Sequence, residues 1–146
     1  MKKVLSLVLA VVMVMGLFAV SAAAEADTSK VKVGFIFLHD ENSTYDLNFL
    51  NAAKEACEKL GVEFVMKKNV PEDNSCYEAA ADLADAGCDI VFADSFGHES
   101  YMLQAARENP DVQFCHATGT MAHTEGLANF HNAFASIYEG RYLAGI

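Results

Sequence analysis

The sequence has few basic residues. Its 146 residues include 10 Lys and Arg against 20 Asp and Glu, which gives a formal net charge of −10. Binding to nucleic acid depends on clustered Lys and Arg, and here these residues are scattered, so nucleic acid is not an expected partner. Only 21% of residues are charged and 53% are hydrophobic. This composition excludes a disordered tail and predicts one folded domain with a single core.

Several short motifs of catalytic and metal sites are also missing. None of the five histidines lies in an HxH, HxxxH or HExxH pattern, so no metal site is expected. No GxSxG motif is present, and Cys115 and His116 are neighbours in an expected strand, where their side chains point to opposite faces. The turn that follows the first expected strand lacks GxGxxG, which excludes dinucleotide binding. We therefore expect no cofactor.

The cysteines do not form a disulfide pattern. No CxxC is present, and the four cysteines fall in separate expected elements, at Cys57, Cys76, Cys88 and Cys115. Although disulfides are common in exported proteins, this dispersal favours four free and mostly buried thiols.

The N-terminus has the three parts of a secretory signal peptide. Lys2 and Lys3 precede an apolar stretch from Val4 to Val20, and small residues follow around Ala22–Ala26. We interpret residues 1–26 as a signal peptide and residues 27–146 as an exported domain. The alternative is an uncleaved membrane anchor, because the apolar stretch is long for a signal. No cysteine stands at the cleavage point, so no lipobox is visible.

The remaining sequence alternates between two hydrophobic periods. Strands are predicted at 31–38, 63–68, 88–94 and 112–117, with a weaker fifth at 127–133. Helices are predicted at 44–60, capped by Ser43 or Thr44; from Asn74 or Ser75 to Gly87; at 99–107; and at 134–146. Such alternation predicts an α/β fold, an open parallel sheet with helices on both faces. The last helix ends on an apolar residue without a cap, so we expect a truncated chain.

Polar and aromatic residues follow the strands at one predicted edge, where open parallel sheets bind their ligands. Tyr45 and Phe96 are candidates to stack on a flat ligand. Candidates for orienting hydrogen bonds are Asp40, Asn42, Ser95 and Thr118. The alternatives are that the two rings fill the core below their loops and that Asn42 or Ser43 caps the following helix.

Four segments, in this order, resemble the basic membrane protein family, the PnrA-like substrate-binding components of ABC importers. They are KVGFIFLHDENSTYDLNFLNAAKEA, ADSFGHES, NPDVQFCHATGT and YEGRYLAGI, and the likeness covers residues 31–146. The resemblance implies a periplasmic-binding-protein fold of type I with two lobes, of which residues 27–146 form the N-terminal one. It also implies a purine nucleoside or nucleobase as ligand, an ABC permease as partner, and a location outside the cytoplasm at the plasma membrane.

The same resemblance implies roles for particular residues. Ser43, Tyr45, Ser95 and Phe96 match positions that contact the base in relatives, and Asp40 and Asn42 match less closely. His116, Thr118 and Gly119 match a motif that shapes the cleft. Relatives that bind nucleobases often have Trp where this sequence has Ser43, and no Trp occurs elsewhere, so stacking would fall to Tyr45 and Phe96.

Two other functions remain open from the sequence. One is a secreted α/β enzyme that acts on a nucleoside or sugar, with Asp94 or His116 as the acid or base. The other is a ligand sensor held at the membrane by an uncleaved N-terminal helix.

Overall fold

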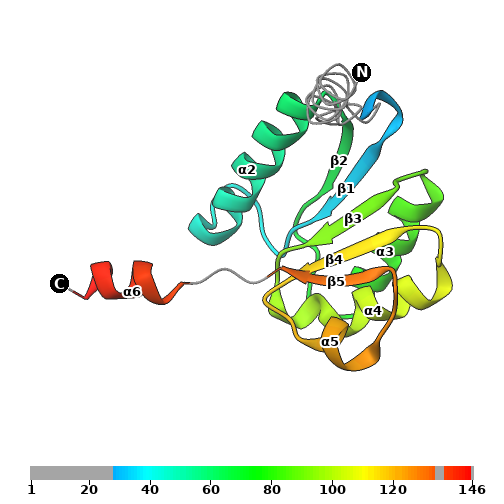
Figure 1. Cartoon of the computed structure of the whole chain (residues 1–146). Helices are drawn as coiled ribbons and strands as arrows, with labels where there is room; N and C mark the ends of the chain where they lie inside the picture. Colours follow the sequence, from blue (N-terminus) through cyan, green and yellow to red (C-terminus); the bar gives the residue numbers. More distant parts are fainter. Residues whose placement is uncertain (1–27, 134–136, 146) are drawn as a thin grey trace, which may run out of the picture.

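A five-stranded parallel sheet forms the centre of the protein (Figure 1). The structure, a computed structural model, describes residues 28–133 and 137–145, so the predicted signal peptide lies outside the described residues. The sheet has the strand order β2-β1-β3-β4-β5. The strands are β1 (Lys32–Ile36), β2 (Glu63–Lys67), β3 (Ile90–Ala93), β4 (Gln113–Ala117) and β5 (Phe130–Ala133). The predicted α/β class with an open parallel sheet is confirmed, including the fifth strand.

Helices cover both faces of the sheet. One face carries α2 (Thr44–Leu60), and the other carries α3 (Asn74–Asp85), α4 (Glu99–Glu108) and α5 (Met121–Glu125) (Figure 1). Two 3-10 turns, η1 (Thr28–Lys30) and η2 (Phe96–His98), precede β1 and α4. After β5 comes α6 (Tyr138–Ala144), which stands apart from the sheet. The prediction of a helix at 134–146 is confirmed for residues 138–144, whereas 134–136 and 146 lie outside the described residues.

Alternation along the strands divides the core between the two faces. The larger cluster contains Ile36, Val91 and Phe114 of the sheet, packed with α3 and α4. The smaller cluster joins Phe37 to Leu50 and Ala53 of α2. Apolar side chains on both faces explain why these strands are nearly continuous hydrophobic runs in the sequence.

The predicted ends of α2 are confirmed, whereas the predicted start of α3 is wrong. Ser43 caps α2, and Gly61, with φ of 65°, ends it. The cap of α3 is Asp73, not Asn74 or Ser75. Asp73 is extended, which places its carboxylate 2.8 Å from the Ser75 N–H, and Asn74 is already the first helical residue. The sequence prediction also missed α5, which is only five residues long.

All four cysteines are free thiols. Cys57, Cys76 and Cys88 are buried, and Cys115 is partly exposed. Burial raises the pKa of Cys76 to about 12, so this thiol stays protonated. Between residues 28 and 133 and between 137 and 145, none of the helices has the length and apolar composition of a membrane span.

Candidate functional site

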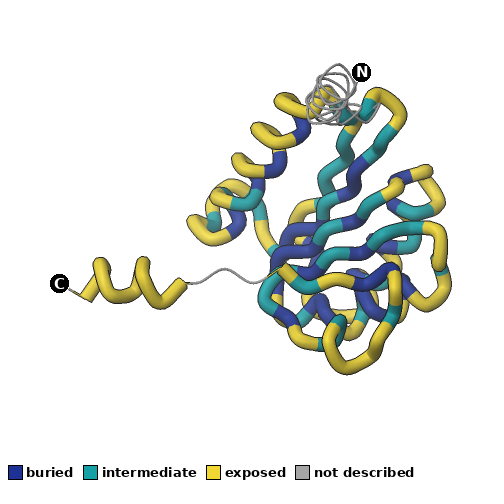
Figure 2. Tube along the Cα trace, viewed as in Figure 1, coloured by how far each residue is buried: buried dark blue, intermediate teal, exposed yellow. Residues whose placement is uncertain are grey.

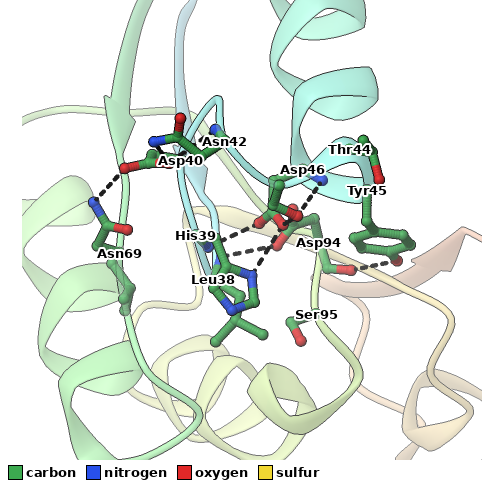
Figure 3. A network of polar contacts seen from close by, with 12 residues as sticks. Leu38, His39, Asp40, Asn42, Thr44, Tyr45, Asp46, Asn69, Asp94 and Ser95 are labelled. Atoms are coloured by element: carbon green, nitrogen blue, oxygen red, sulfur yellow. Dashed lines mark hydrogen bonds and ion pairs between the residues drawn. The ribbon is translucent and has the colours of Figure 1, made fainter.

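The loops that follow β1 and β3 meet at the carboxyl edge of the sheet (Figure 3). The Leu38 N–H donates to Asp94 Oδ1 over 3.2 Å. The Tyr45 hydroxyl, from the first turn of α2, donates to the Asp94 carbonyl over 2.9 Å. β1 and β3 are neighbours although β2 separates them in sequence, so the order of the sheet reverses here. In parallel sheets this is the place where ligand sites form.

Asp46, in the first turn of α2, anchors the β1–α2 loop through His39 (Figure 3). Its buried carboxylate accepts the His39 N–H over 2.8 Å and lies 3.1 Å from His39 Nδ1. The Ser43 hydroxyl, which caps α2, also donates to it. Burial acts to raise the pKa of Asp46, but the hydrogen bonds from Ser43 and His39 outweigh it and lower the pKa to about 2. Asp46 is therefore charged at neutral pH.

Asp94 has the opposite electrostatic character. Its carboxyl is almost wholly buried, and its Oδ1 accepts the Leu38 N–H. Burial, and secondly the charge of Asp46, raise the pKa of Asp94 to about 7. The two acids thus differ in protonation at mildly acidic pH: Asp46 is charged and Asp94 is neutral.

The loop after β3 presents an exposed ring. Phe96 is 70% exposed, whereas its neighbour Ser95 is buried. Glu72, in the turn before α3, accepts the Ser95 hydroxyl over 2.5 Å and the Gly97 N–H over 2.8 Å. These two bonds, in that order, lower the pKa of Glu72. The Glu72 carboxylate, from a different loop, therefore binds the residues on both sides of Phe96.

Two buried histidines support these loops from beneath. His116 Nε2 donates to the Ser95 carbonyl over 2.6 Å, and His98 Nε2 donates to the Val70 carbonyl over 2.9 Å. Burial lowers the pKa of both rings, which are therefore neutral at pH 7. His116 lies within β4, on the face covered by α3 and α4. It supports Ser95 from inside the protein and does not reach the open edge.

Thr118 and Gly119 form a close turn after β4. Thr118 has a φ of 68°, a conformation that is uncommon for residues other than glycine. Its N–H donates to the Ala133 carbonyl over 2.9 Å. A Cβ on Gly119 would collide with the Glu99 carboxylate and with His116 Nδ1. The turn therefore packs closely against the Glu99 side chain, whose Oε1 also accepts the Met121 N–H over 2.7 Å.

Asp40 and Asn42 brace the outer side of the β1–α2 loop. Both the backbone N–H and the amide of Asn42 lie 2.9 Å from Asp40 Oδ1. Asp40 Oδ2 faces the Asn69 amide at 3.5 Å. These contacts tie the loop to the turn after β2.

The structure gathers Tyr45 and Ser95 around the Asp94 backbone, with Phe96 next along the same loop. Tyr45 is 49% exposed and its ring packs against Phe49 at 5.0 Å, so one part of the ring contacts the protein and the rest is open. Ser43 is the helix cap, as one alternative predicted. Stacking by Tyr45 and Phe96 stays a prediction.

Two residues of this site were missed by the sequence analysis. Asp46 had a signal, because Ser43 and Asp46 form the S-x-x-D pattern of a capping box. Glu72 had none, because its partner Ser95 is 23 residues away in sequence. Within the described residues, no group of three or more His, Cys, Asp and Glu side chains is placed to hold a metal ion.

The family model of PnrA-like ABC transporter substrate-binding proteins matches residues 30–146. The chain belongs to this family. Its members are substrate-binding proteins rather than enzymes.

Two individual proteins are similar to this chain over different lengths. It is 35% identical over 134 residues to a purine-binding protein of Brucella abortus, which covers 88% of this chain and 36% of that protein. A Haloferax volcanii protein whose name assigns it to glucose binding for an ABC transporter is 37% identical over 62 residues, 42% of this chain and 15% of that protein. This member of the family therefore spans about a third of the length of the Brucella protein.

A solved structure shows the same fold. An ABC transporter solute-binding protein from Conexibacter woesei superposes with a TM-score of 0.61 at 23% identity, covering 71% of this chain and 35% of that one.

Proposed function

We propose that residues 27–146 form the N-terminal lobe of an exported solute-binding protein that captures a purine nucleoside or nucleobase and delivers it to an ABC permease. The lobe supplies half of a cleft, and a second lobe closes over the ligand by a hinge motion. No bond of the ligand is broken. Residues 1–26 direct export and are then removed.

The observation that carries this proposal is the pair of partly free rings at the switch point of the sheet. Tyr45 and Phe96 are 49% and 70% exposed, and both belong to segments fixed by hydrogen bonds to neighbouring loops. Flat heteroaromatic ligands gain about 1–3 kcal/mol per stacked ring. Exposing large aromatic rings to water costs free energy, and stacking against a flat purine ring removes them from water.

An enzyme is less well supported by the same geometry. A carboxyl whose pKa is about 7, such as Asp94, has the value that acid–base catalysis uses. However, Asp94 is only 3% exposed, and His116 is fully buried with Nε2 occupied by the Ser95 carbonyl. Neither group reaches a substrate at the open edge.

The ligand claim is tested by isothermal titration calorimetry on the full natural protein with adenine, guanine, adenosine, guanosine, glucose and ribose. We expect one purine compound to bind and the sugars to give no heat. Phe96→Ala should weaken that binding about 5-fold to 150-fold, as the loss of one stacked ring predicts. Leu60→Ala is the matched control, because Leu60 is 59% exposed at the far end of α2.

Glucose binding without purine binding would overturn the ligand class and favour a sugar importer. Product formation from any nucleoside would favour the enzyme instead. Export is checked separately by sequencing the mature N-terminus, which should begin near Asp27; an intact N-terminus would favour the membrane-tethered sensor.

A further inference from the structure

His39 is an exposed side chain in the loop that follows β1, at the edge of the candidate site (Figure 3). Its side chain is 58% exposed, whereas that of Asp46 is fully buried. The His39 N–H donates to Asp46 Oδ1 over 2.8 Å, and the ring nitrogen Nδ1 lies 3.1 Å from Asp46 Oδ2. One buried carboxylate therefore binds both the backbone and the ring of His39, which fixes the direction of the ring.

Asp46 also determines which ring nitrogen of His39 carries the proton. Burial acts to raise the pKa of Asp46, but hydrogen bonds lower it to about 2, so the carboxylate is charged and can only accept. Nδ1 is then the donor of the pair, and in a neutral imidazole the other nitrogen, Nε2, is an acceptor. Figure 3 shows Nε2 on the side of the ring that points away from Asp46. His39 therefore presents an acceptor in a fixed direction.

The surroundings of this ring are open and contain further acceptors. Residues 38–43 are exposed or of intermediate exposure, whereas the last residues of β1 and β3 are buried (Figure 2). The Asp40 carboxylate lies in the same loop. Glu72 is close enough to His39 for an electrostatic interaction, and it accepts the Ser95 hydroxyl from the loop after β3. An open site with several acceptors favours a solute that donates hydrogen bonds.

We propose that His39 Nε2 accepts a hydrogen bond from an exocyclic amino group of the bound purine, and that this bond makes the site selective for aminopurines. The inference rests on the proposed function, in which Tyr45 and Phe96 cover the faces of a flat ring. Contacts with the faces do not distinguish one purine from another, so selectivity needs a residue that contacts the edge of the ring. An amino group donates through two N–H bonds. An oxo group in its place is itself an acceptor and would meet the lone pair of Nε2 without a hydrogen bond.

Two substitutions of His39 separate its two ring bonds. His39→Asn places an amide N–H near the position of Nδ1, which keeps the bond to Asp46 and removes the outer acceptor. His39→Gln is longer, so its amide oxygen reaches the position of Nε2, which keeps the outer acceptor and loses the bond to Asp46. His131→Asn is the matched control. His131 is exposed, and its Nε2 lies 2.9 Å from the side chain of Gln113, which begins β4 at the opposite edge of the sheet.

Isothermal titration calorimetry on the full natural protein compares adenosine with purine riboside and guanosine with inosine. The second member of each pair lacks the exocyclic amino group. The titrations are done at about pH 8, where histidine side chains are ordinarily neutral. We expect the unmodified protein to bind adenosine or guanosine more tightly than its counterpart without the amino group.

The variants should change this preference in different ways. His39→Asn should weaken binding of the amino compound about 5-fold to 150-fold, the effect of leaving one polar group unpaired, and should change binding of its counterpart by less than about 2-fold. His39→Gln should retain part of the preference, and His131→Asn should retain all of it. Circular dichroism checks that each variant is folded. If His39→Asn is not folded, retention of the preference by His39→Gln still tests the acceptor.

Four results would overturn the inference and leave the proposed function intact. Equal or tighter binding of the counterparts by the unmodified protein would show that the site does not select an amino group. An unchanged preference in His39→Asn would assign that selection to another residue. Equal losses for both members of a pair would show that His39 only shapes the loop, and so would normal binding in His39→Asn with a loss in His39→Gln. If the unmodified protein binds no purine, the proposed function itself is refuted, and the inference with it.

Discussion

Replacing Asp94 by Asn tests the electrostatics of the site most directly. The folded protein holds a proton on Asp94 up to pH about 7, whereas the unfolded chain loses it near 3.8. This raised pKa contributes stability at low pH that is lost as the pH rises through 7. Between pH 5 and pH 8 the loss is about 2.6 kcal/mol, from about 1.4 kcal/mol for each pKa unit. Asn cannot ionise, so the variant lacks this pH dependence.

Urea unfolding of the protein at pH 5 and pH 8 measures the effect. The stability of Asp94→Asn relative to the unmodified protein should increase by about 2.6 kcal/mol from pH 5 to pH 8. His98 and His116 titrate in both proteins, so their contributions cancel in this difference. Asp111→Asn, at an exposed turn, should show no such increase. A difference between Asp94→Asn and the parent that is the same at both pH values would refute the reasoning.

Three further predictions concern the supports of the site. Glu72→Gln should speed hydrogen exchange at the Gly97 N–H, because a neutral acceptor binds this N–H less tightly than a carboxylate does. NMR measures the exchange rate, and an unchanged rate would contradict a stabilising role for Glu72. Gly119→Ala should cost about 1–3 kcal/mol in urea unfolding, since its Cβ has no room, whereas Gly140→Ala, in open space, should cost nothing. Asn129→Leu should lower the free energy of unfolding by about 3 kcal/mol or more, because the Asn129 amide donates to three backbone carbonyls. A melting temperature close to that of the unmodified protein would argue against this role.

The sheet could be predicted from the sequence because its strands are buried on both faces. Phe35 and Ile36, adjacent in β1, face opposite clusters, so the segment is a continuous hydrophobic run. Helix ends were predictable where one residue determines them, as Gly61 does by its positive φ. The prediction failed at Asp73 because several adjacent residues can cap a helix, and the choice depends on which one is extended.

The candidate site was predictable only in part. Its position followed from the topology, since residues after parallel strands meet at one edge, and Tyr45 and Ser95 do meet there. The direction of each side chain did not follow. His116 belongs to the same motif as Thr118, yet it points into the core, and Glu72 enters through contacts distant in sequence. Local patterns carry no information about such contacts.

The polar bonds of this edge share one property: most end on backbone atoms of a neighbouring loop. Tyr45 and His116 donate to the carbonyls of Asp94 and Ser95, and Asp94 accepts the N–H of Leu38. The loops are thus already ordered before a solute arrives, and little conformational entropy remains to be lost on binding. Under the proposed function, affinity then depends on the contacts that Tyr45 and Phe96 make with the solute, because the hydrogen bonds that fix the loops are already formed.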